Sequence, residues 1–283
     1  MVVAMKEIIL DIDGTLLNSQ RIISPRTKQA LLDAQASGVK LVLASGRPTK
    51  GMIGLAHELE MDQHDGLLVS YNGARVTDVQ TNEILFDQPI PSDLVVKVLE
   101  HLKQFDAVVM INDDQYVYVN DVFSGMIENE GQTINIIQYE AHDGGFLLCE
   151  VQDLAKFATF PIPKILIAGS SEYLHSISDQ IYAPFKNKLN GAFSSPCYFE
   201  FTDLGIDKAK ALSIVNQKLA IAPSDVIAFG DAPNDRSIVE YAGVGVVMDN
   251  GTVDMKAIAD YVTASNNEDG IAVALEKFLV VSD

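Results

Sequence analysis

The stretch KEIILDIDGTLLNSQ, residues 6–20, places a run of apolar residues directly before two carboxylates. Such a run is typical of a short buried strand, and Gly14 lets the backbone turn at once. Asp11 and Asp13 are two residues apart, so on a continuing strand both side chains leave the same face. One such carboxylate can attack a reacting atom while the other moves protons. Keeping both ionised is costly unless a cation lies between them, and oxygen ligands favour a hard metal ion.

Strand and helix patterns alternate outward from this stretch. We expect strands at residues 40–45 and 66–73, and helices at residues 26–38 and 49–60. Ser24 and Pro25 are typical of an N-cap and a first helical position. Short apolar strands separated by helices of this length predict right-handed βαβ units and a parallel sheet. Residues 74–88 differ, because two extended runs flank Thr81-Asn82 and predict a hairpin.

The pattern changes at about residue 90. A helix leads into a hairpin around Asp113-Asp114, and INIIQYE (134–140) is expected to be extended. Extended segments are more often adjacent here, which indicates an α+β insert with an antiparallel sheet. After about Leu204 the strand–helix alternation returns. We therefore expect a Rossmann-like α/β core formed by residues 1–88 and 201–283, interrupted by an α+β domain at residues 89–200.

Two further expected strand ends carry polar groups. Ser45 and Gly46 follow the strand at 40–45 just before a helix, where a hydroxyl and a backbone N–H can cradle a phosphate. Alone, this SGRP segment is explained as well by a turn. Asp231 ends the apolar strand at 225–231, and Asn234 and Asp235 follow in the next turn. They offer another metal carboxylate, an amide donor and a further acid, although each residue alone could simply cap a helix.

Lys208 opens the predicted helix KAKALSIV, where the helix dipole does not favour a cation. A lysine there is usually solvated, but it could also balance a cluster of carboxylates. Lys210 is the competing residue, and its spacing places it on another face of the helix. Acids, a hydroxyl, an amide and a lysine at one sheet edge suit phosphoryl transfer, in which catalysis is mostly positioning and charge neutralisation.

Composition excludes several classes of protein. The formal charge of −19, with twenty scattered basic residues, argues against binding to nucleic acid. Apolar runs stay below the roughly 18 residues needed to span a membrane, and the first residues lack the pattern of a secretory signal. Cys149 and Cys197 have no metal-ligand spacing and are expected to pack as small apolar residues. We therefore expect a cytoplasmic protein.

The motifs DIDGTL, LASGR, the lysine of GIDKAKAL, and FGDAPND resemble, in order, the four motifs of haloacid dehalogenase (HAD) superfamily phosphatases. The insert and the SYNGA segment resemble the Cof-type branch, subclass IIB, with its C2 cap. The resemblance spans the whole chain. It implies a phosphomonoesterase that acts on small phosphorylated metabolites, sugar phosphates first, through an aspartyl-phosphate.

The resemblance also implies the role of each motif residue. Asp11 would be the nucleophile and Asp13 the acid and base. Mg²⁺ would be held by the side chains of Asp11 and Asp231 and by the backbone carbonyl of Asp13, with Asp235 as a metal or supporting acid. The phosphate would be bound by the following residues: Ile12 through its backbone, Ser45, Gly46, Lys208 and Asn234.

The chain departs from the family pattern at a few positions. Ser45 replaces the commoner threonine and keeps the hydroxyl, Ala209 stands where glycine is usual, and Asn250 occupies a variant of a glycine–asparagine pair. In the insert, residues 112–114 and 142–145 could line the entrance to the site, although solvated hairpin tips explain them as well. The sequence does not identify the substrate or the oligomeric state.

Two other functions fit parts of the pattern. A phosphomannomutase-like mutase shares the aspartate pair, but it must hold a second phosphate, usually with arginines. Residues 89–198 contain no arginine, six lysines and fourteen acids, which disfavours a mutase. A catalytically silent metabolite-binding module is the other alternative. It is disfavoured because a binder needs no nucleophile beside a proton donor.

Overall fold

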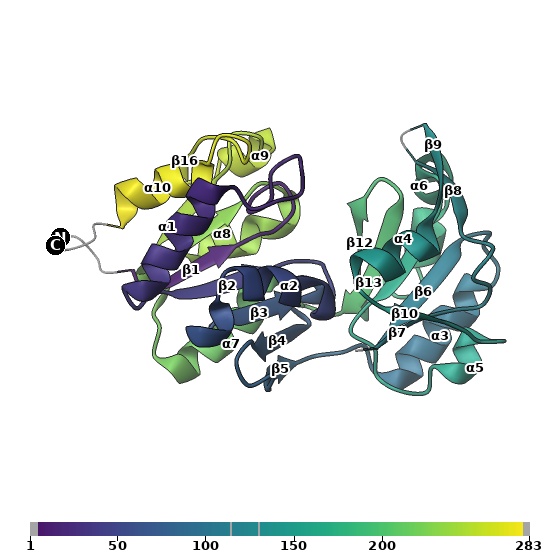
Figure 1. Ribbon diagram of the computed structural model, residues 1–283. Coiled ribbons are helices and arrows are strands. Elements are labelled where there is room, and N and C mark those ends of the chain that lie inside the picture. Colours follow the sequence, from purple (N-terminus) through teal and green to yellow (C-terminus); the bar gives the residue numbers. More distant parts are fainter. Residues whose placement is uncertain (1–4, 114, 130, 280–283) are drawn as a thin grey trace. The chain divides into compact units, whose positions relative to one another are not determined.

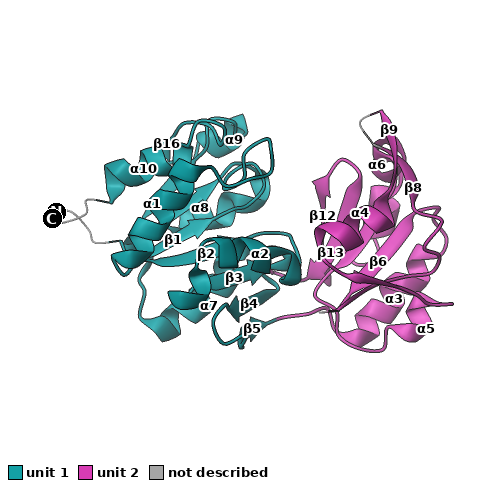
Figure 2. Ribbon diagram, viewed as in Figure 1, with its two compact units in different colours: residues 1–87, 207–283 teal, residues 88–206 magenta. Residues whose placement is uncertain are grey.

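The computed structural model describes residues 5–113, 115–129 and 131–279. The chain divides into two compact units, coloured separately in Figure 2. Unit 1 comprises residues 1–87 and 207–283, and unit 2 comprises residues 88–206. Strand β13, Tyr198–Asp203, belongs to unit 2 and continues past residue 200. The chain returns to unit 1 at Asp207.

Among the described residues, unit 1 contains an eight-stranded sheet in the order β16-β15-β14-β1-β2-β3-β4-β5, visible in Figure 1. The strands are β1 Glu7–Leu10, β2 Lys40–Ala44, β3 Leu67–Ser70, β4 Arg75–Asp78, β5 Ile84–Asp87, β14 Val226–Gly230, β15 Val244–Val247 and β16 Tyr261–Val262. Neighbours from β16 to β3 are parallel, whereas β4 and β5 join antiparallel. The predicted parallel α/β core and the hairpin at residues 74–88 are both confirmed.

Helices cover both faces of this sheet. The helices are α1 Pro25–Ala36, α2 Lys50–Glu58, α7 Lys208–Leu219, α8 Arg236–Tyr241, α9 Val253–Lys256 and α10 Gly270–Phe278. The apolar residues of α1, α2 and α10 form one buried cluster with Ile8 and Leu10 of β1. Those of α7 and α8 form a second cluster with Ile9, which points to the opposite face. Because β1 is buried on both sides, its apolar run is continuous, as expected for a central parallel strand.

Two local expectations for unit 1 have different outcomes. Helix α1 begins as predicted, because the Ser24 hydroxyl accepts a hydrogen bond from the backbone N–H of Thr27 and Pro25 is the first helical residue. The strand expected at 66–73 is wrong at its end. β3 stops at Ser70, and a 3₁₀ turn, Tyr71–Gly73, follows. Tyr71 and Asn72 have φ values of 53° and 56°, and this left-handed backbone ends the strand.

Unit 2 contains a six-stranded sheet among its described residues, in the order β10-β7-β6-β11-β13-β12. Besides β13, its elements are α3 Ser92–Leu102, β6 Val108–Asn112, β7 Tyr116–Val119, β8 Met126–Asn129, β9 Gln132–Asn135, α4 Ile136–Asp143, β10 Leu147–Glu150, α5 Leu154–Phe157, β11 Ile165–Ala168, α6 Ser171–Tyr182 and β12 Leu189–Ser195. The sheet is antiparallel except that β10 joins β7 in parallel. The predicted α+β character is confirmed.

Within unit 2, the extended segment expected at 134–140 is confirmed for Ile134 and Asn135, which end β9, and is wrong beyond them. Residues 136–143 form helix α4, because Asn135 caps the helix by accepting a hydrogen bond from the backbone N–H of Gln138. Strands β6 and β7 form the predicted hairpin, and the Asp113 carboxylate accepts hydrogen bonds from the backbone of Gln115 and Tyr116. Asp114 lies outside the described residues.

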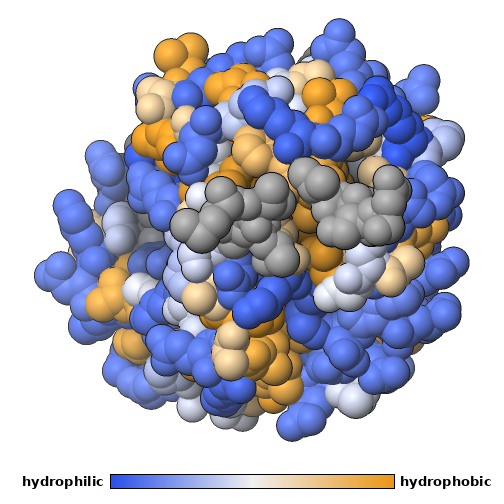
Figure 3. Space-filling model, turned by 90° about the vertical axis from the view of Figure 1, so that its left-hand side faces the viewer, coloured by the Kyte–Doolittle hydropathy of each residue, from blue (hydrophilic) through white to orange (hydrophobic). Residues whose placement is uncertain are grey.

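The surface is consistent with the acidic, charged composition. Figure 3 shows one face of the molecule, on which hydrophilic residues make up most of the area. Among the described residues, every helix is too short or too polar to cross a bilayer.

Candidate active site

The carboxyl ends of three central strands in unit 1 carry the predicted motif residues. Asp11 follows β1, Ser45 follows β2 and Asp231 follows β14. Since β14, β1 and β2 are parallel neighbours, these residues meet at one edge of the sheet, where ligands bind in open α/β folds. Ile12 buries its side chain in the core, so only its backbone is available to a ligand there.

A buried lysine lies between two buried carboxylates at this edge. Lys208 Nζ donates to Asp11 Oδ1 and to Asp235 Oδ1, and both distances are 2.6 Å. Lys208 is 1% exposed, Asp11 5% and Asp235 0%. Lys208 is the first residue of α7, whose N-cap Asp207 accepts from the backbone N–H of Lys210. Lys210 itself is exposed, so the structure brings Lys208, not Lys210, to the carboxylates.

The electrostatics of this cluster are unusual. Burial and the negative charge of Asp235 raise the pKa of Asp11 well above its usual value, although Lys208 opposes the shift. Burial alone would lower the pKa of Lys208, but Asp11 and Asp235 outweigh burial and raise it. The raised pKa favours the charged form of Lys208, which contacts two carboxyl groups at once.

Asp231 completes the acidic cluster. Its Oδ1 accepts a hydrogen bond of 2.8 Å from the Thr15 hydroxyl. Burial raises its pKa to about 6, with Asp235 adding to the shift and Thr15 opposing it. Gly14 has φ +87°, and a Cβ there would lie 2.6 Å from Asp231 Oδ2. The turn after β1 therefore requires glycine both for its backbone and for the space that Asp231 fills.

The donor set fits a divalent cation. Asp11, Asp231 and Asp235 each offer a carboxylate oxygen, and these atoms lie within 4.8 Å of one another. All-oxygen ligands are those that Mg²⁺ prefers. A cation between Asp11 and Asp231 would also reverse the raised pKa values that burial and repulsion cause at both groups. Asp235 is already engaged, because its Oδ2 accepts from the backbone N–H groups of Asp231 and Ala232.

Asp13 is held away from this cluster by an arginine that the sequence analysis did not select. Arg47 Nε donates to Asp13 Oδ2 at 2.8 Å, and Arg47 Nη2 donates to Oδ1 at 2.6 Å. The Asp13 side chain is 56% exposed, whereas that of Asp11 is 7% exposed. The two aspartates therefore differ in environment, which is how paired carboxylates acquire different chemical roles.

The residues expected to form a phosphate cradle lie close together around Ser45. The Ser45 hydroxyl accepts from the backbone N–H of Arg47, and its carbonyl accepts from the N–H of Asn72. Asn72 also approaches Asn234, whose Nδ2 donates to Asn72 Oδ1 at 3.5 Å. A Cβ on Gly46 would lie 3.1 Å from Asn72 Nδ2, so Gly46, Asn72 and Asn234 are close neighbours.

Four residues that the sequence analysis did not place in the site belong to its framework: Thr15, Arg47, Asn72 and Asn250. Asn250, at the variant of the glycine–asparagine pair, donates from Nδ2 to the Gly14 carbonyl at 2.8 Å and so supports the turn beside Asp231. In the SYNGA segment, polar residues follow an apolar run, and this pattern could have indicated Asn72 as a site residue. Local sequence carried no signal for the pairing of Arg47 with Asp13.

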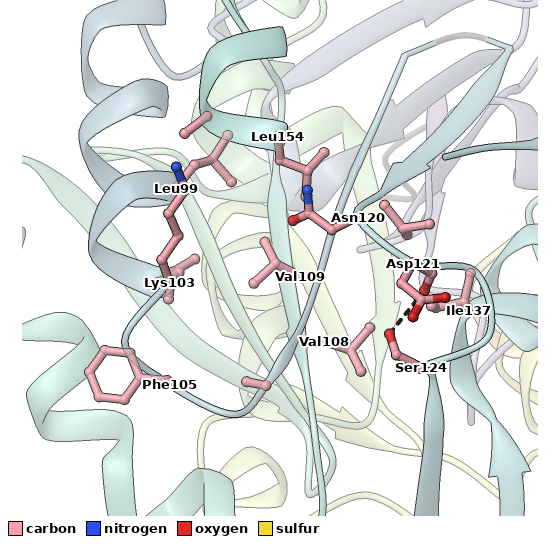
Figure 4. A pocket seen from close by; sticks show the side chains of 14 residues that line it. Leu99, Lys103, Phe105, Val108, Val109, Asn120, Asp121, Ser124, Ile137 and Leu154 are labelled. Carbon is pink, nitrogen blue, oxygen red and sulfur yellow. Dashed lines mark hydrogen bonds between the residues drawn. The ribbon is translucent and has the colours of Figure 1, made fainter. Parts of the chain in front are cut away.

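Unit 2 contains a separate cavity of about 260 Å³. Figure 4 shows Val108 and Val109 of β6, Asn120 and Asp121 after β7, and Leu154 of α5 around it. The Asn120 amide donates to the Val151 carbonyl, and Asp121 accepts from the backbone of Phe123. Asp121 is the one acid among the described residues that line the cavity, so the cavity does not resemble the acidic cluster of unit 1.

Comparisons with known proteins agree with this geometry. Residues 8–275 match the family of haloacid dehalogenase-like hydrolases. A protein of Streptococcus pyogenes serotype M6 is 30% identical over 98% of this chain and 99% of its own length. The 5-amino-6-(5-phospho-D-ribitylamino)uracil phosphatase of Bacillus subtilis is 29% identical over 98% of this chain and 97% of its own length.

A solved structure is similar over almost the whole chain. The crystal structure of a haloacid dehalogenase-like hydrolase from Bacteroides thetaiotaomicron is 33% identical, with a TM-score of 0.88. It covers 97% of this chain, and all of that chain is matched. The motifs, the fold and these matches agree, and the chain therefore belongs to the haloacid dehalogenase-like hydrolases, as a phosphatase of the Cof-type branch that its motifs resemble.

Proposed function

We propose that the chain is a Mg²⁺-dependent phosphomonoesterase that hydrolyses small phosphorylated metabolites in the cytoplasm, with sugar and polyol phosphates as the first class to test. The observation that carries the proposal is the buried contact of Lys208 with Asp11 and Asp235, beside Asp231. A nucleophilic carboxylate, a fixed cation and further oxygen ligands are what phosphoryl transfer requires. The name of the Bacillus subtilis relative, which places a phosphate on a ribityl chain, supports polyol phosphates.

The nucleophile is Asp11. In the first step its free oxygen attacks phosphorus and forms an aspartyl-phosphate, while the carboxyl of Asp13 gives its proton to the leaving oxygen. In the second step Asp13 takes a proton from water, which attacks phosphorus and releases phosphate and Asp11. Lys208 neutralises one equatorial oxygen of the phosphoryl group throughout. The backbone N–H of Ile12 and the polar groups of Ser45, Gly46 and Asn234 orient the remaining oxygens.

A bound Mg²⁺ would supply positive charge that offsets the negative charge of the carboxylates and of the phosphoryl group. Asp11, Asp231 and the Asp13 backbone carbonyl are the groups that would hold it. We assign Asp235 to support, because both of its oxygens already accept hydrogen bonds, from Lys208 on one side and from the Asp231 and Ala232 backbone on the other. Its charge would then keep Lys208 protonated and fix the position of Asp231.

The proposal is tested by the hydrolysis of a generic aryl phosphate and of a panel of hexose, pentitol and glycerol phosphates, with Mg²⁺ and after chelation. We expect turnover only with Mg²⁺. Because the pKa of Asp231 is about 6 without a metal, protons compete for this ligand, and the apparent affinity for Mg²⁺ should fall as the pH drops below about 6. Full turnover after chelation would contradict the proposal. A folded protein that binds Mg²⁺ but hydrolyses none of these esters would also contradict it.

A second prediction concerns Arg47. Its two hydrogen bonds hold Asp13, so Arg47→Ala should lower kcat by up to the roughly 10²–10⁴-fold that general acid–base catalysis supplies. The loss should be smallest for aryl phosphates with acidic leaving groups, which need least protonation. Arg75→Ala is the matched control, because Arg75 also pairs with an aspartate of the same unit, Asp87, and not with Asp13. If kcat falls equally for substrates with acidic and with basic leaving groups, Arg47 does not support acid catalysis by Asp13.

A further inference from the structure

Helix α7 lies along β1 with a polar contact at each end. Lys208 contacts Asp11 at one end, and Asn216, eight residues later, contacts Glu7, four residues before Asp11. Eight helical residues rise about 12 Å and four strand residues about 13 Å. The two spacings match, so α7 runs antiparallel to β1 and the second contact fixes how far along the strand the helix lies.

Glu7 is a carboxyl group in an apolar setting. It is 0% exposed, and its Oε2 accepts a hydrogen bond of 2.6 Å from Asn216 Nδ2. Its other oxygen, Oε1, and the Asn216 Oδ1 are both buried and have no hydrogen-bond partner among the described residues. Two buried acceptors without a donor are costly. A carboxylate cannot donate, whereas a carboxylic acid has one O–H to give.

The surrounding groups stabilise the ionised form of Glu7 too weakly to offset its burial. Lys40 is opposite Glu7 on β2, but its Nζ donates to the Asp65 carbonyl. On β14 the opposite residue is the apolar Val226. From α8, the Tyr241 hydroxyl lies 3.5 Å from Asn216 Nδ2. Burial raises the pKa of Glu7 to about 7, with the Asn216 hydrogen bond and Lys40 opposing the shift. Burial and Glu7 also raise the pKa of Tyr241, although Asn216 opposes that shift.

We propose that Glu7 is a neutral carboxylic acid in the folded protein and donates its proton to Asn216 Oδ1. The two side chains then form an acid–amide pair joined by two hydrogen bonds. This pair sets the position of α7 along β1 and holds Lys208 at Asp11. Glu7 and Asn216 are thus positioning residues. The second half of this inference rests on the proposed role of Lys208 in phosphoryl transfer, whereas the protonation of Glu7 does not.

The protonation is tested with Glu7→Gln, which can form the same pair with its amide and stays neutral at every pH. A group whose folded pKa is raised from 4.5 to about 7 gives stability that is present below pH 4.5 and is lost as the pH rises through 7. The ratio of the wild-type unfolding constant to that of Glu7→Gln should therefore increase with pH. Between pH values well below 4.5 and well above 7, the ratio should increase roughly 300-fold. Urea unfolding at several pH values measures this ratio.

A ratio that does not change with pH would show that Glu7 is not protonated and would overturn the inference. If Glu7→Gln does not fold, the ¹³C resonance of the Glu7 carboxyl in the wild type provides the same test. A titration midpoint near 4.5 overturns the inference, and one near 7 supports it.

Positioning is tested by the pH–rate profile. The kcat of Glu7→Gln relative to the wild type should be close to one at pH 5.5 and rise several-fold at pH 8.5, where an ionised Glu7 repels Asn216 Oδ1 and loosens α7. Gln35→Leu is the control. Gln35 is another buried amide with one unpartnered oxygen, and its Nε2 donates to the Leu59 carbonyl in a different part of unit 1. This variant should lower stability without changing the profile.

The outcomes separate the two proposals. If the ratio of unfolding constants changes with pH but the pH–rate profile does not, the pair has only a structural role. This result would overturn the claim that the pair positions Lys208. A wild type without phosphatase activity would contradict the proposed function and the positioning half together, while the unfolding experiment would still decide the protonation of Glu7.

Discussion

Asp11→Asn should abolish the hydrolysis of phosphate monoesters, with a loss of roughly 10⁴-fold or more in kcat, because it removes the proposed nucleophile. An amide keeps the shape of the carboxylate but is a very poor nucleophile. Lys208 keeps its contact with Asp235 in this variant, so the fold should survive. Steady-state kinetics at saturating Mg²⁺ and substrate measure the loss. Residual activity within tenfold of the wild type would mean that the nucleophile lies elsewhere.

The intermediate gives a second readout of the same prediction. With an aryl phosphate whose leaving group needs no proton, Asp13→Asn should still form the aspartyl-phosphate, but it should hydrolyse this intermediate slowly because no base activates water. Acid quenching followed by intact-protein mass spectrometry should show a phosphoryl adduct that accumulates in Asp13→Asn and is absent from Asp11→Asn. An adduct of equal intensity in both variants would refute the division of labour between the two aspartates.

Lys208→Met should cause the largest loss of stability among the site variants. It leaves Asp11 and Asp235 buried and facing one another without their shared cation. Removing one partner of a buried ion pair typically costs about 3–5 kcal/mol. The double variant Lys208→Met/Asp235→Asn should recover much of this loss, because only one buried carboxylate then lacks its cation. Urea unfolding of the single and double variants, without Mg²⁺, measures both effects.

Lys164→Met provides a control in unit 2. Lys164 and Glu200 form another buried pair, with Nζ 2.8 Å from Glu200 Oε1. Both lysine variants should lose stability, but only Lys208→Met should lose aryl phosphatase activity in conditions where the protein remains folded. A Lys208→Met variant as stable as the wild type would show that the carboxylates take up a proton at little cost.

The sequence predicts the fold of unit 1 well, because its information is local and repeated. Apolar strands bounded by capped helices, such as the one that begins after Ser24, specify βαβ units without knowledge of distant contacts. The motif residues could be found for the same reason. Asp11, Ser45 and Asp231 each follow an apolar strand, and parallel strands carry their carboxyl ends to one edge.

The sequence does not predict contacts that join distant segments by side-chain reach. Arg47 and Asp13 lie 34 residues apart, and Glu7 and Asn216 lie 209 apart, and neither pair belongs to a repeating pattern. The extended segment expected at 134–140 fails beyond Asn135 for another reason. Its isoleucines favour a strand, but the cap at Asn135 starts a helix, and short apolar runs do not distinguish these states.

The arrangement of the two halves of unit 1 also bears on protein synthesis. Strand β1 carries Asp11, but its neighbour β14 begins at Val226, more than two hundred residues later in the chain. At about 5–20 residues per second, the ribosome makes β14 roughly 10–40 s after β1. Until then β1 lacks one neighbour, and Asp11 lacks both Lys208 and Asp231. Unit 2 is translated in full during this interval, so a nascent chain can carry a folded insert before it has any catalytic centre.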